Sequence, residues 1–154
     1  MIPLVLEINT LLQSNLDEIA LDSGYENSFW ALDEYSQQIE DYLEVLEDMT
    51  RTLGKGIKRL RRRQQHFESL TAEADRSAQQ FSSEGQEKLS RAAYTRKRVM
   101  QQASEAYGEE ANLQNARFLT LMDAKLRLEA RLTEVTQRGS TMEPVLQSGR
   151  MWGT

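Results

Sequence analysis

Apolar residues recur at helical spacing along most of this chain. In the first twenty residues they lie mainly three and four apart, which predicts a short amphipathic helix over residues 1–21. Gly24 then provides a helix stop, and Asn27 or Ser28 an N-cap for the next helix, so residues 22–28 are predicted to form a linker. The apolar positions of the first helix are Leu4, Ile8, Leu11, Leu12, Leu16 and Ile19.

Two longer apolar series lie on either side of the stretch FSSEG, residues 81–85. The first alternates by three and four, the pattern of a coiled-coil seam, and slips in phase near Gly54 and Gly56. The second is predicted to end at Gly139 and Ser140. The first series is Leu32, Tyr35, Ile39, Tyr42, Leu46, Met49 and Leu53, followed by Ile57, Leu60, Phe67 and Leu70; the second is Ala93, Met100, Tyr107, Phe118, Leu121, Leu128, Leu132 and Val135.

Together the two series predict an antiparallel hairpin, in which facing residues have a constant index sum. A sum of 167 places the turn near residues 82–86. Among the pairs that it predicts is Phe67 with Met100. The expected fold is therefore all-α, with the N-terminal amphipathic helix, a long antiparallel helical hairpin (a coiled coil) over residues 29–138, and a flexible tail over residues 139–154.

Charge is strongly segregated along the sequence. Residues 1–50 hold twelve of the 24 acids and none of the 19 Lys and Arg residues, whereas seven of the thirteen residues in RTLGKGIKRLRRR, residues 51–63, are basic. The same index sum places part of this cluster opposite acids, as Arg62 opposite Glu105. Three interpretations stay open: solvated flanks of a coiled coil, a contact for the acidic part of another subunit, or a site for nucleic acid or anionic lipid.

Residues suited to catalysis or metal binding are few. The chain has no cysteine and one histidine, His66, which is expected to be a polar flank beside Phe67. GKG at residues 54–56 lacks the rest of a phosphate-binding loop. We therefore expect no enzyme activity, no metal and no cofactor. No apolar run approaches the ~18 residues of a membrane span, and the start lacks the basic segment of a secretory signal. The expected location is the cytoplasm, free or peripheral on the inner face of the cytoplasmic membrane.

The segment EGQEKLSRAAYTRK, residues 84–97, resembles the hairpin tip of the phage-shock protein A family. The matching positions are Gly85, Glu87, Leu89, Arg91, Ala92 and Ala93. Residues 8–19, INTLLQSNLDEI, are similar to that family's first short helix and acidic turn. The resemblance implies a shortened or divergent member of the bacterial branch of the ESCRT-III superfamily. Such hairpins polymerise, bind or remodel the cytoplasmic membrane and use no cofactor; some restrain a transcriptional activator.

The first functional hypothesis is a non-enzymatic, self-assembling hairpin of the membrane-remodelling or membrane-stress type, held by hairpin packing and acidic-to-basic contacts. The alternative is a soluble coiled-coil adaptor or regulator that binds a protein partner without membrane contact. Expected partners are copies of the chain, a regulatory protein and, weakly, lipid; nucleic acid is not expected, because the basic stretch lacks aromatic readers. The predicted membrane-binding residues are Ile2, Leu4, Val5 and Ile8, and the predicted self-assembly residues are Leu11, Leu12, Arg61, Arg62, Arg63 and Trp152.

Overall fold

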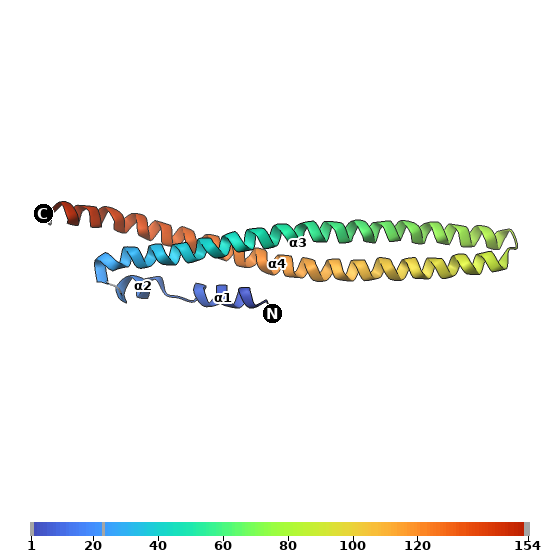
Figure 1. Cartoon of the computed structure of the whole chain (residues 1–154), viewed down its shortest axis with the longest axis horizontal. Helices are drawn as coiled ribbons and strands as arrows, with labels where there is room; N and C mark the ends of the chain where they lie inside the picture. The colour runs from blue at the N-terminus through green and yellow to red at the C-terminus, as the bar shows by residue number, and fades with distance from the viewer. Residues whose placement is uncertain (1, 23, 153–154) are drawn as a thin grey trace. The chain divides into compact units, whose positions relative to one another are not determined.

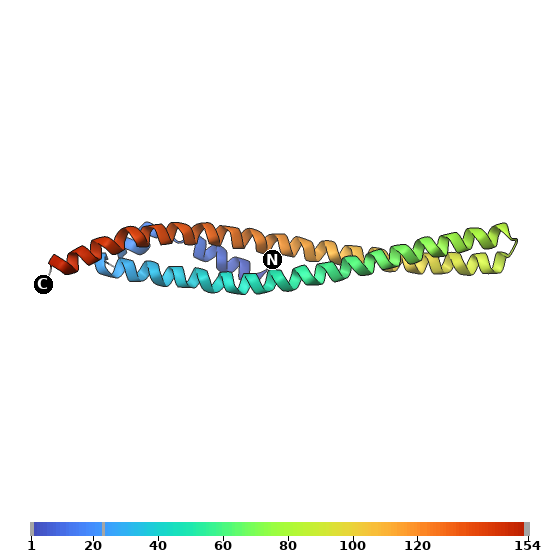
Figure 2. The same ribbon diagram turned by 90° about the horizontal axis from the view of Figure 1, so that it is seen from above.

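Four helices occupy the residues that the computed structural model describes, 2–22 and 24–152, with side chains described over 2–19 and 29–140. The helices are α1 (Pro3–Leu12), α2 (Leu16–Asp22), α3 (Gly24–Ser83) and α4 (Glu87–Trp152). α3 and α4 pack together as a hairpin (Figures 1 and 2), which confirms the predicted all-α fold. The chain divides into two compact units: unit 1 is Met1–Thr50 with Leu119–Thr154, and unit 2 is Arg51–Phe118.

The hairpin tip lies where the sequence predicts it, between the end of α3 and the start of α4. α3 ends in a Schellman motif, in which Gly85 has a φ of +74° and its N–H donates to the carbonyl of Ser82 at 3.1 Å. The N–H of Gln86 donates to the carbonyl of Phe81 at 2.9 Å. Glycine suits this position because a Cβ is strained at positive φ. The motif satisfies the last carbonyls of α3 and reverses the chain.

The N-terminal segment contains two helices, whereas the apolar spacing predicted one over residues 1–21. Asn15 starts the second helix: its Oδ1 accepts a hydrogen bond from the N–H of Asp17 at 2.9 Å, and its carbonyl accepts one from the N–H of Ile19 at 3.1 Å. This is N-cap geometry. Asp17 and Glu18 then favour the positive end of the new helix. The apolar series hid the break because its spacing continues across it.

Two further helix boundaries differ from the prediction. α3 begins at Gly24, so residues 24–28 are helical and do not belong to a linker. Glycine is acceptable at a helix start, where it costs little relative to a capping residue. α4 continues through Gly139 and Ser140 to Trp152, so the predicted helix stop is wrong. A glycine inside a helix costs only about 1 kcal/mol relative to alanine, which neighbouring helical turns can offset.

Unit 1 has a core of large apolar side chains to which the N-terminal segment contributes. Ile8 of α1 is fully buried, at 0% exposure, and Val5 and Leu16 are also buried. α1 is therefore an integral part of this core. The two long helices contribute the parts of the predicted seams that lie in unit 1, together with Ala124, which neither seam included. The buried residues are Leu32, Tyr35, Ile39 and Leu46 of α3 and Leu121, Ala124, Leu128 and Val135 of α4.

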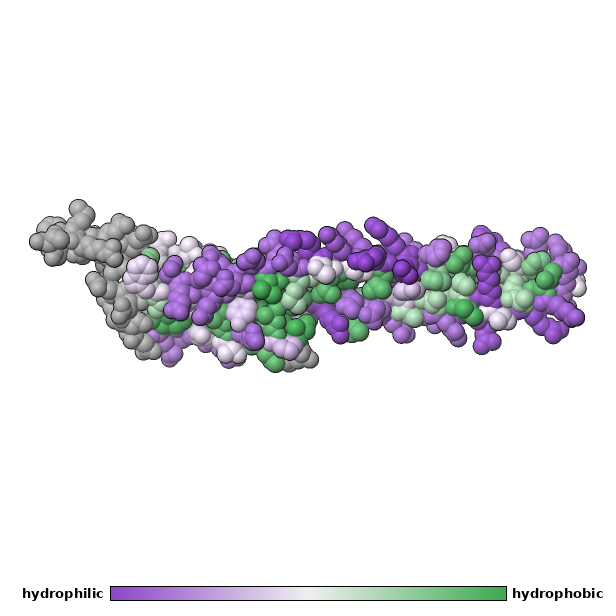
Figure 3. Space-filling view, viewed as in Figure 1, coloured by the Kyte–Doolittle hydropathy of each residue, from purple (hydrophilic) through white to green (hydrophobic). Residues whose placement is uncertain are grey.

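Unit 2 buries only small apolar side chains, those of Ala74, Ala78 and Ala111. Gly108 of α4 leaves room for the side chain of Gln64 of α3: a Cβ added to Gly108 would lie 2.7 Å from Nε2 of Gln64. Apolar side chains reach the surface among polar ones along the hairpin (Figure 3). The seam of unit 2 is thus open on the sides that the partner helix does not cover. Its half-buried members are Leu53, Ile57, Leu60, Phe67, Leu70, Ala93, Met100, Tyr107 and Phe118.

Contacts between α3 and α4 in unit 2 give index sums from 168, for Ser90 with Ala78, to 174, so they differ from the predicted 167 by one to seven residues. The rings of Phe67 and Tyr107 stack with their centroids 5.5 Å apart, which gives an index sum of 174 in place of 167. Lys97 Nζ lies 2.9 Å from Asp75 Oδ1, a sum of 172. Each side chain of a coiled-coil seam packs among several residues of the facing helix, so apolar spacing and the position of the tip do not specify which individual side chains touch. Aromatic stacking favours the observed contact.

A pair of cysteines tests this register, because the chain has none of its own. We expect Phe67→Cys with Tyr107→Cys to form an intramolecular disulfide on mild oxidation. Phe67→Cys with Met100→Cys should not, because seven residues displace the partner by ~10 Å along the helix. Mass spectrometry of the unreduced protein distinguishes the two. A disulfide in the second pair alone would restore the predicted sum of 167.

Candidate functional site

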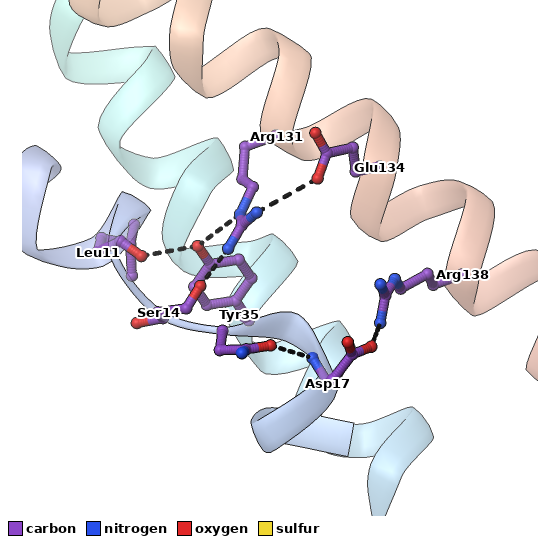
Figure 4. Close-up of polar contacts among 8 residues, drawn as sticks. Leu11, Ser14, Asp17, Tyr35, Arg131, Glu134 and Arg138 are labelled. Atoms are coloured by element: carbon purple, nitrogen blue, oxygen red, sulfur yellow. Dashed lines mark hydrogen bonds and ion pairs between the residues drawn. The ribbon is translucent and has the colours of Figure 1, made fainter. Parts of the chain in front are cut away.

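In unit 1, α4 holds the N-terminal segment through Arg131 (Figure 4). Its guanidinium donates to the carbonyl of Ser14 and, through Nε at 3.3 Å, to the hydroxyl of Tyr35. That hydroxyl donates in turn to the carbonyl of Leu11 at 2.7 Å. Glu134 lies 3.2 Å from the guanidinium and balances its charge. Because the Arg131 side chain is only 19% exposed, these charge-assisted bonds are partly shielded from water.

Two further arginines of α4 contact the same segment. Arg127 donates to Oδ1 of Asn9 at 2.8 Å, and Arg138 pairs with the carboxylate of Asp17. Both arginine side chains are nearly half exposed, so each contact contributes less than the Arg131 network. We call Arg127, Arg131 and Arg138 the arginine clamp. It fixes α1, the α1–α2 connection and the start of α2 against α4.

An open groove of about 670 Å³ in unit 1 is lined by residues of α1, the segment after it and α3. Two of its lining residues, Glu7 and Asp41, are acids, and none is basic. Tyr42 donates to Oε2 of Glu7 at 3.4 Å. Partial burial and the neighbouring Glu7 carboxylate raise the pKa of Tyr42 above its ordinary value. The other lining residues are Thr10, Leu11, Ser14, Gln38 and Val45.

The four residues predicted to bind a membrane do not share one environment. Val5 and Ile8 are buried in unit 1, while Ile2 and Leu4 are half-buried. Val5 and Ile8 can reach a bilayer only if α1 leaves its place in the core. Leu6, which the sequence analysis did not select, is 48% exposed. Its position between Val5 and Ile8 left it off the predicted apolar face.

The predicted self-assembly residues also divide. Leu11 and Leu12 are half-buried in unit 1, and the side chain of Trp152 lies outside those described. Arg61 donates to Asn112 at 2.7 Å and to Gln64 at 3.0 Å. Arg63 donates to the hydroxyl of Tyr107 at 3.3 Å. Both are therefore engaged within unit 2.

Arg62, by contrast, is exposed. Within the described residues it forms no ion pair with Glu105, so the predicted pairing is wrong. At an index sum of 172, the value of the Lys97–Asp75 pair, Arg62 and Glu105 do not lie opposite each other. Arg62 is thus the member of the Arg61–Arg63 run whose charge stays available to a partner.

Exposed charges are unevenly distributed along α3: its exposed bases lie in unit 2, whereas most of its exposed acids lie in unit 1. Sequence reasoning placed part of the basic stretch opposite acids of the second arm and did not identify which of its bases stay without an ion pair. The exposed residues of α3 that make no ion pair with another described residue include the acids Asp33, Glu34, Glu40 and Glu44 in unit 1 and the bases Lys55, Lys58, Arg59 and Arg62 in unit 2.

The described side chains do not assemble a metal site: no three His, Asp or Glu residues gather as ligands there. His66 is exposed, with its ring edge-on to that of Phe67 at a centroid distance of 5.5 Å. Over residues 2–22 and 24–152, no helix combines the length and the apolar character needed to cross a bilayer. The sequence matches no family model and no curated protein. The resemblance to the phage-shock protein A family therefore stays a prediction.

Removing the Tyr35 hydroxyl tests the clamp. We expect Tyr35→Phe to lower the free energy of unfolding by about 1–3 kcal/mol, because the Leu11 carbonyl and the Arg131 guanidinium each lose a partner in a shielded place. The rate of amide hydrogen exchange over residues 3–22 should also increase in this variant. Tyr42→Phe is the matched control and should cost less than about 0.5 kcal/mol, since its bond is long and lies at the surface. Equal losses in the two variants would contradict a special role for Tyr35.

Proposed function

We propose that this chain is a non-enzymatic helical hairpin that assembles with copies of itself. The observation that carries the proposal is the open seam of unit 2, where the large apolar residues of α3 and α4 stay half-buried. In unit 1, α1 packs on the hairpin and adds buried apolar side chains to its core. A second hairpin packed on unit 2 would cover the seam there, as neighbouring helices do in bundles.

Apolar side chains on the exposed surface of α4 support this proposal. Within unit 2, Val99 is 53% exposed, Leu113 50% and Leu89 49%. Val99 and Leu113 are two heptads apart, so they lie on the same side of α4. Burying apolar surface contributes about 25 cal/mol per Å², so contacts repeated along a long helix give a pair of hairpins substantial stability.

The separation of charge supports association between copies and gives it a direction. The exposed bases of α3 lie in unit 2 and most of its exposed acids lie in unit 1, with Glu68 and Glu73 as exceptions, so two copies offer each other complementary surfaces. Complementary potentials accelerate encounter and suppress wrong arrangements. Exposed charges are screened over ~8 Å at physiological ionic strength, so the assembly should weaken as salt rises.

The proposal also includes membrane contact, and the exposed apolar residues at the start of the chain support it. Leu6 is exposed, Ile2 and Leu4 are half-buried, and the first turn of α1 carries no acid. These residues can insert while Ile8 stays in the core. Acids later in the segment, including Asp17, oppose attraction to anionic lipid. Binding is therefore weak and favours neutral bilayers. The resemblance to a membrane-remodelling family points the same way.

Assembly is tested with Val99→Glu combined with Leu113→Glu. We expect this variant to keep its helicity and to associate at least tenfold more weakly in analytical ultracentrifugation, because it places charge on an apolar contact. Gln102→Glu with Asn115→Glu adds the same charge at exposed polar positions of α4 and should associate nearly normally. A parent protein that stays monomeric at high concentration would refute self-assembly and favour the soluble adaptor.

Lipid contact is tested by flotation with neutral vesicles that have packing defects and with anionic vesicles. We expect weak binding to the neutral vesicles, less to the anionic ones, and loss of both in Leu6→Glu with the oligomers intact. Leu126→Glu is the control, because Leu126 is also exposed, at 59%, but belongs to α4 and not to α1. Equal binding by both variants would remove α1 from the membrane role.

A further inference from the structure

The groove of unit 1, which α1 and α3 line, combines apolar side chains with acids. Leu11 and Val45 supply apolar surface, and Val45 is 46% exposed. Of the two acids, Glu7 accepts a hydrogen bond from the hydroxyl of Tyr42 at 3.4 Å, and Asp41 accepts one from a side-chain amide of its own helix at 3.1 Å. Both donors are neutral, and neither acid forms an ion pair with another described residue. The two carboxylates are therefore available to a cation from outside the chain.

The size and the lining of the groove indicate what fits it. On α3 the lining residues run from Gln38 to Val45, which is seven residues, ~10 Å, or about two turns of a helix. A small cation would leave the apolar side chains uncovered, and a purely apolar helix would leave the carboxylates unpaired. A helix face that carries both apolar and basic side chains matches both features, as in other complexes of an amphipathic helix in a groove.

α4 exposes a face of this kind in unit 2, close to the hairpin tip. At ~100° of rotation per residue its members fall within an arc of roughly 100° over three turns. Leu89 and Val99 are 49% and 53% exposed, while Lys88 and Arg96 are exposed and form no ion pair with another described residue. Residues 88–104 contain no acid. We call this the tip face, and its members are Lys88, Leu89, Ala92, Arg96 and Val99.

We infer that the groove of one copy binds the tip face of a second copy. This inference rests on the proposed self-assembly and names two surfaces that carry it. Lys88 and Arg96 lie eight residues apart, or ~12 Å along α4, so they can pair with Glu7 of α1 and Asp41 of α3. Ala92 lies between them and is small, which lets the two surfaces approach closely. Because the surfaces differ, each copy can engage one neighbour through its groove and another through its tip face.

Three other exposed surfaces match the groove less well. The exposed bases of α3 in unit 2 have no exposed large apolar side chain beside them. Leu126 of α4 is exposed, but the basic residues on either side of it form ion pairs within α4. Leu113 follows Glu109 and Glu110 by about one turn, and these acids would repel those of the groove. Complementary charge therefore favours the tip face as the occupant.

Single cysteines test which surfaces meet. Gln38→Cys, in the groove, and Ala92→Cys, on the tip face, are purified separately, oxidised mildly alone and as an equal mixture, and analysed without reduction. We expect a disulfide between the two variants in the mixture only, because alone each cysteine meets a surface without one. Gln101→Cys is the control, since Gln101 is exposed but lies on another side of α4. Equal crosslinking of Gln38→Cys to Ala92→Cys and to Gln101→Cys would overturn the inference.

Charge reversal tests the same contact without cysteines. One variant carries Glu7→Lys with Asp41→Lys, and the other carries Lys88→Glu with Arg96→Glu. We expect each alone to associate at least tenfold more weakly than the parent, because its groove and its tip face then have the same sign of charge. The equal mixture should recover association, since each groove meets a tip face of opposite charge on the other variant.

A control variant separates the groove from the overall charge of the chain. Glu18→Lys with Glu40→Lys changes the net charge by the same amount, at exposed positions of unit 1 that do not line the groove. We expect it to lose clearly less affinity than Glu7→Lys with Asp41→Lys. Circular dichroism verifies that all three variants remain helical. Equal losses in the control and the groove variant would overturn the inference.

The possible failures of these tests are distinguishable. A parent that assembles without the crosslink between groove and tip face refutes the inference, leaves the proposed self-assembly standing, and leaves the groove to a basic helix of another protein. The same holds if both charge-reversal variants assemble as the parent does. A parent that is monomeric throughout refutes both this contact and the proposed self-assembly.

Discussion

Two packed helices can bury only the side chains that lie between them, and the rest of this structure depends on that limit. In unit 1 the limit is overcome by α1, whose Val5 and Ile8 are buried together with the large residues of the hairpin. In unit 2 no third helix is present among the described residues, and the fully buried apolar positions there are alanines. The same hairpin therefore has one part with a complete core and one part that can gain stability from a second molecule.

The segregation of charge along α3 costs a single molecule stability. Like charges four residues apart on a helix repel by a few tenths of a kcal/mol per pair, and such pairs include Glu40 with Glu44 and Lys55 with Arg59. Because an acidic block precedes a basic block along this part of α3, few opposite charges lie close enough to compensate. Contact with an oppositely charged block removes the repulsion on both copies. A feature that weakens an isolated helix can in this way favour a specific pair.

The sequence was sufficient for the existence and pairing of the two long helices and for the hairpin tip, because heptad spacing and Gly85 each have a direct structural meaning, but it missed the break between α1 and α2 and the ends of the long helices. It failed for individual pairs: Phe67 was placed opposite Met100 but stacks on Tyr107, because apolar spacing does not specify which side chains of the facing helix touch. The arginine clamp was missed for a different reason. Arg131 forms a hydrogen bond with the carbonyl of Ser14, 117 residues away in the sequence, and a local sequence pattern does not predict such a contact.

The clamp recognises the N-terminal segment largely through its backbone. Arg131 and Tyr35 bond to the carbonyl oxygens of Ser14 and Leu11, and every amino acid supplies a carbonyl. Substitutions at these two positions can therefore leave the attachment intact, provided that the bend before Asn15 keeps its shape. Related sequences can therefore differ at residues 11–14 and still keep the segment docked. The positions that reveal the attachment in such sequences are those of Tyr35 and Arg131.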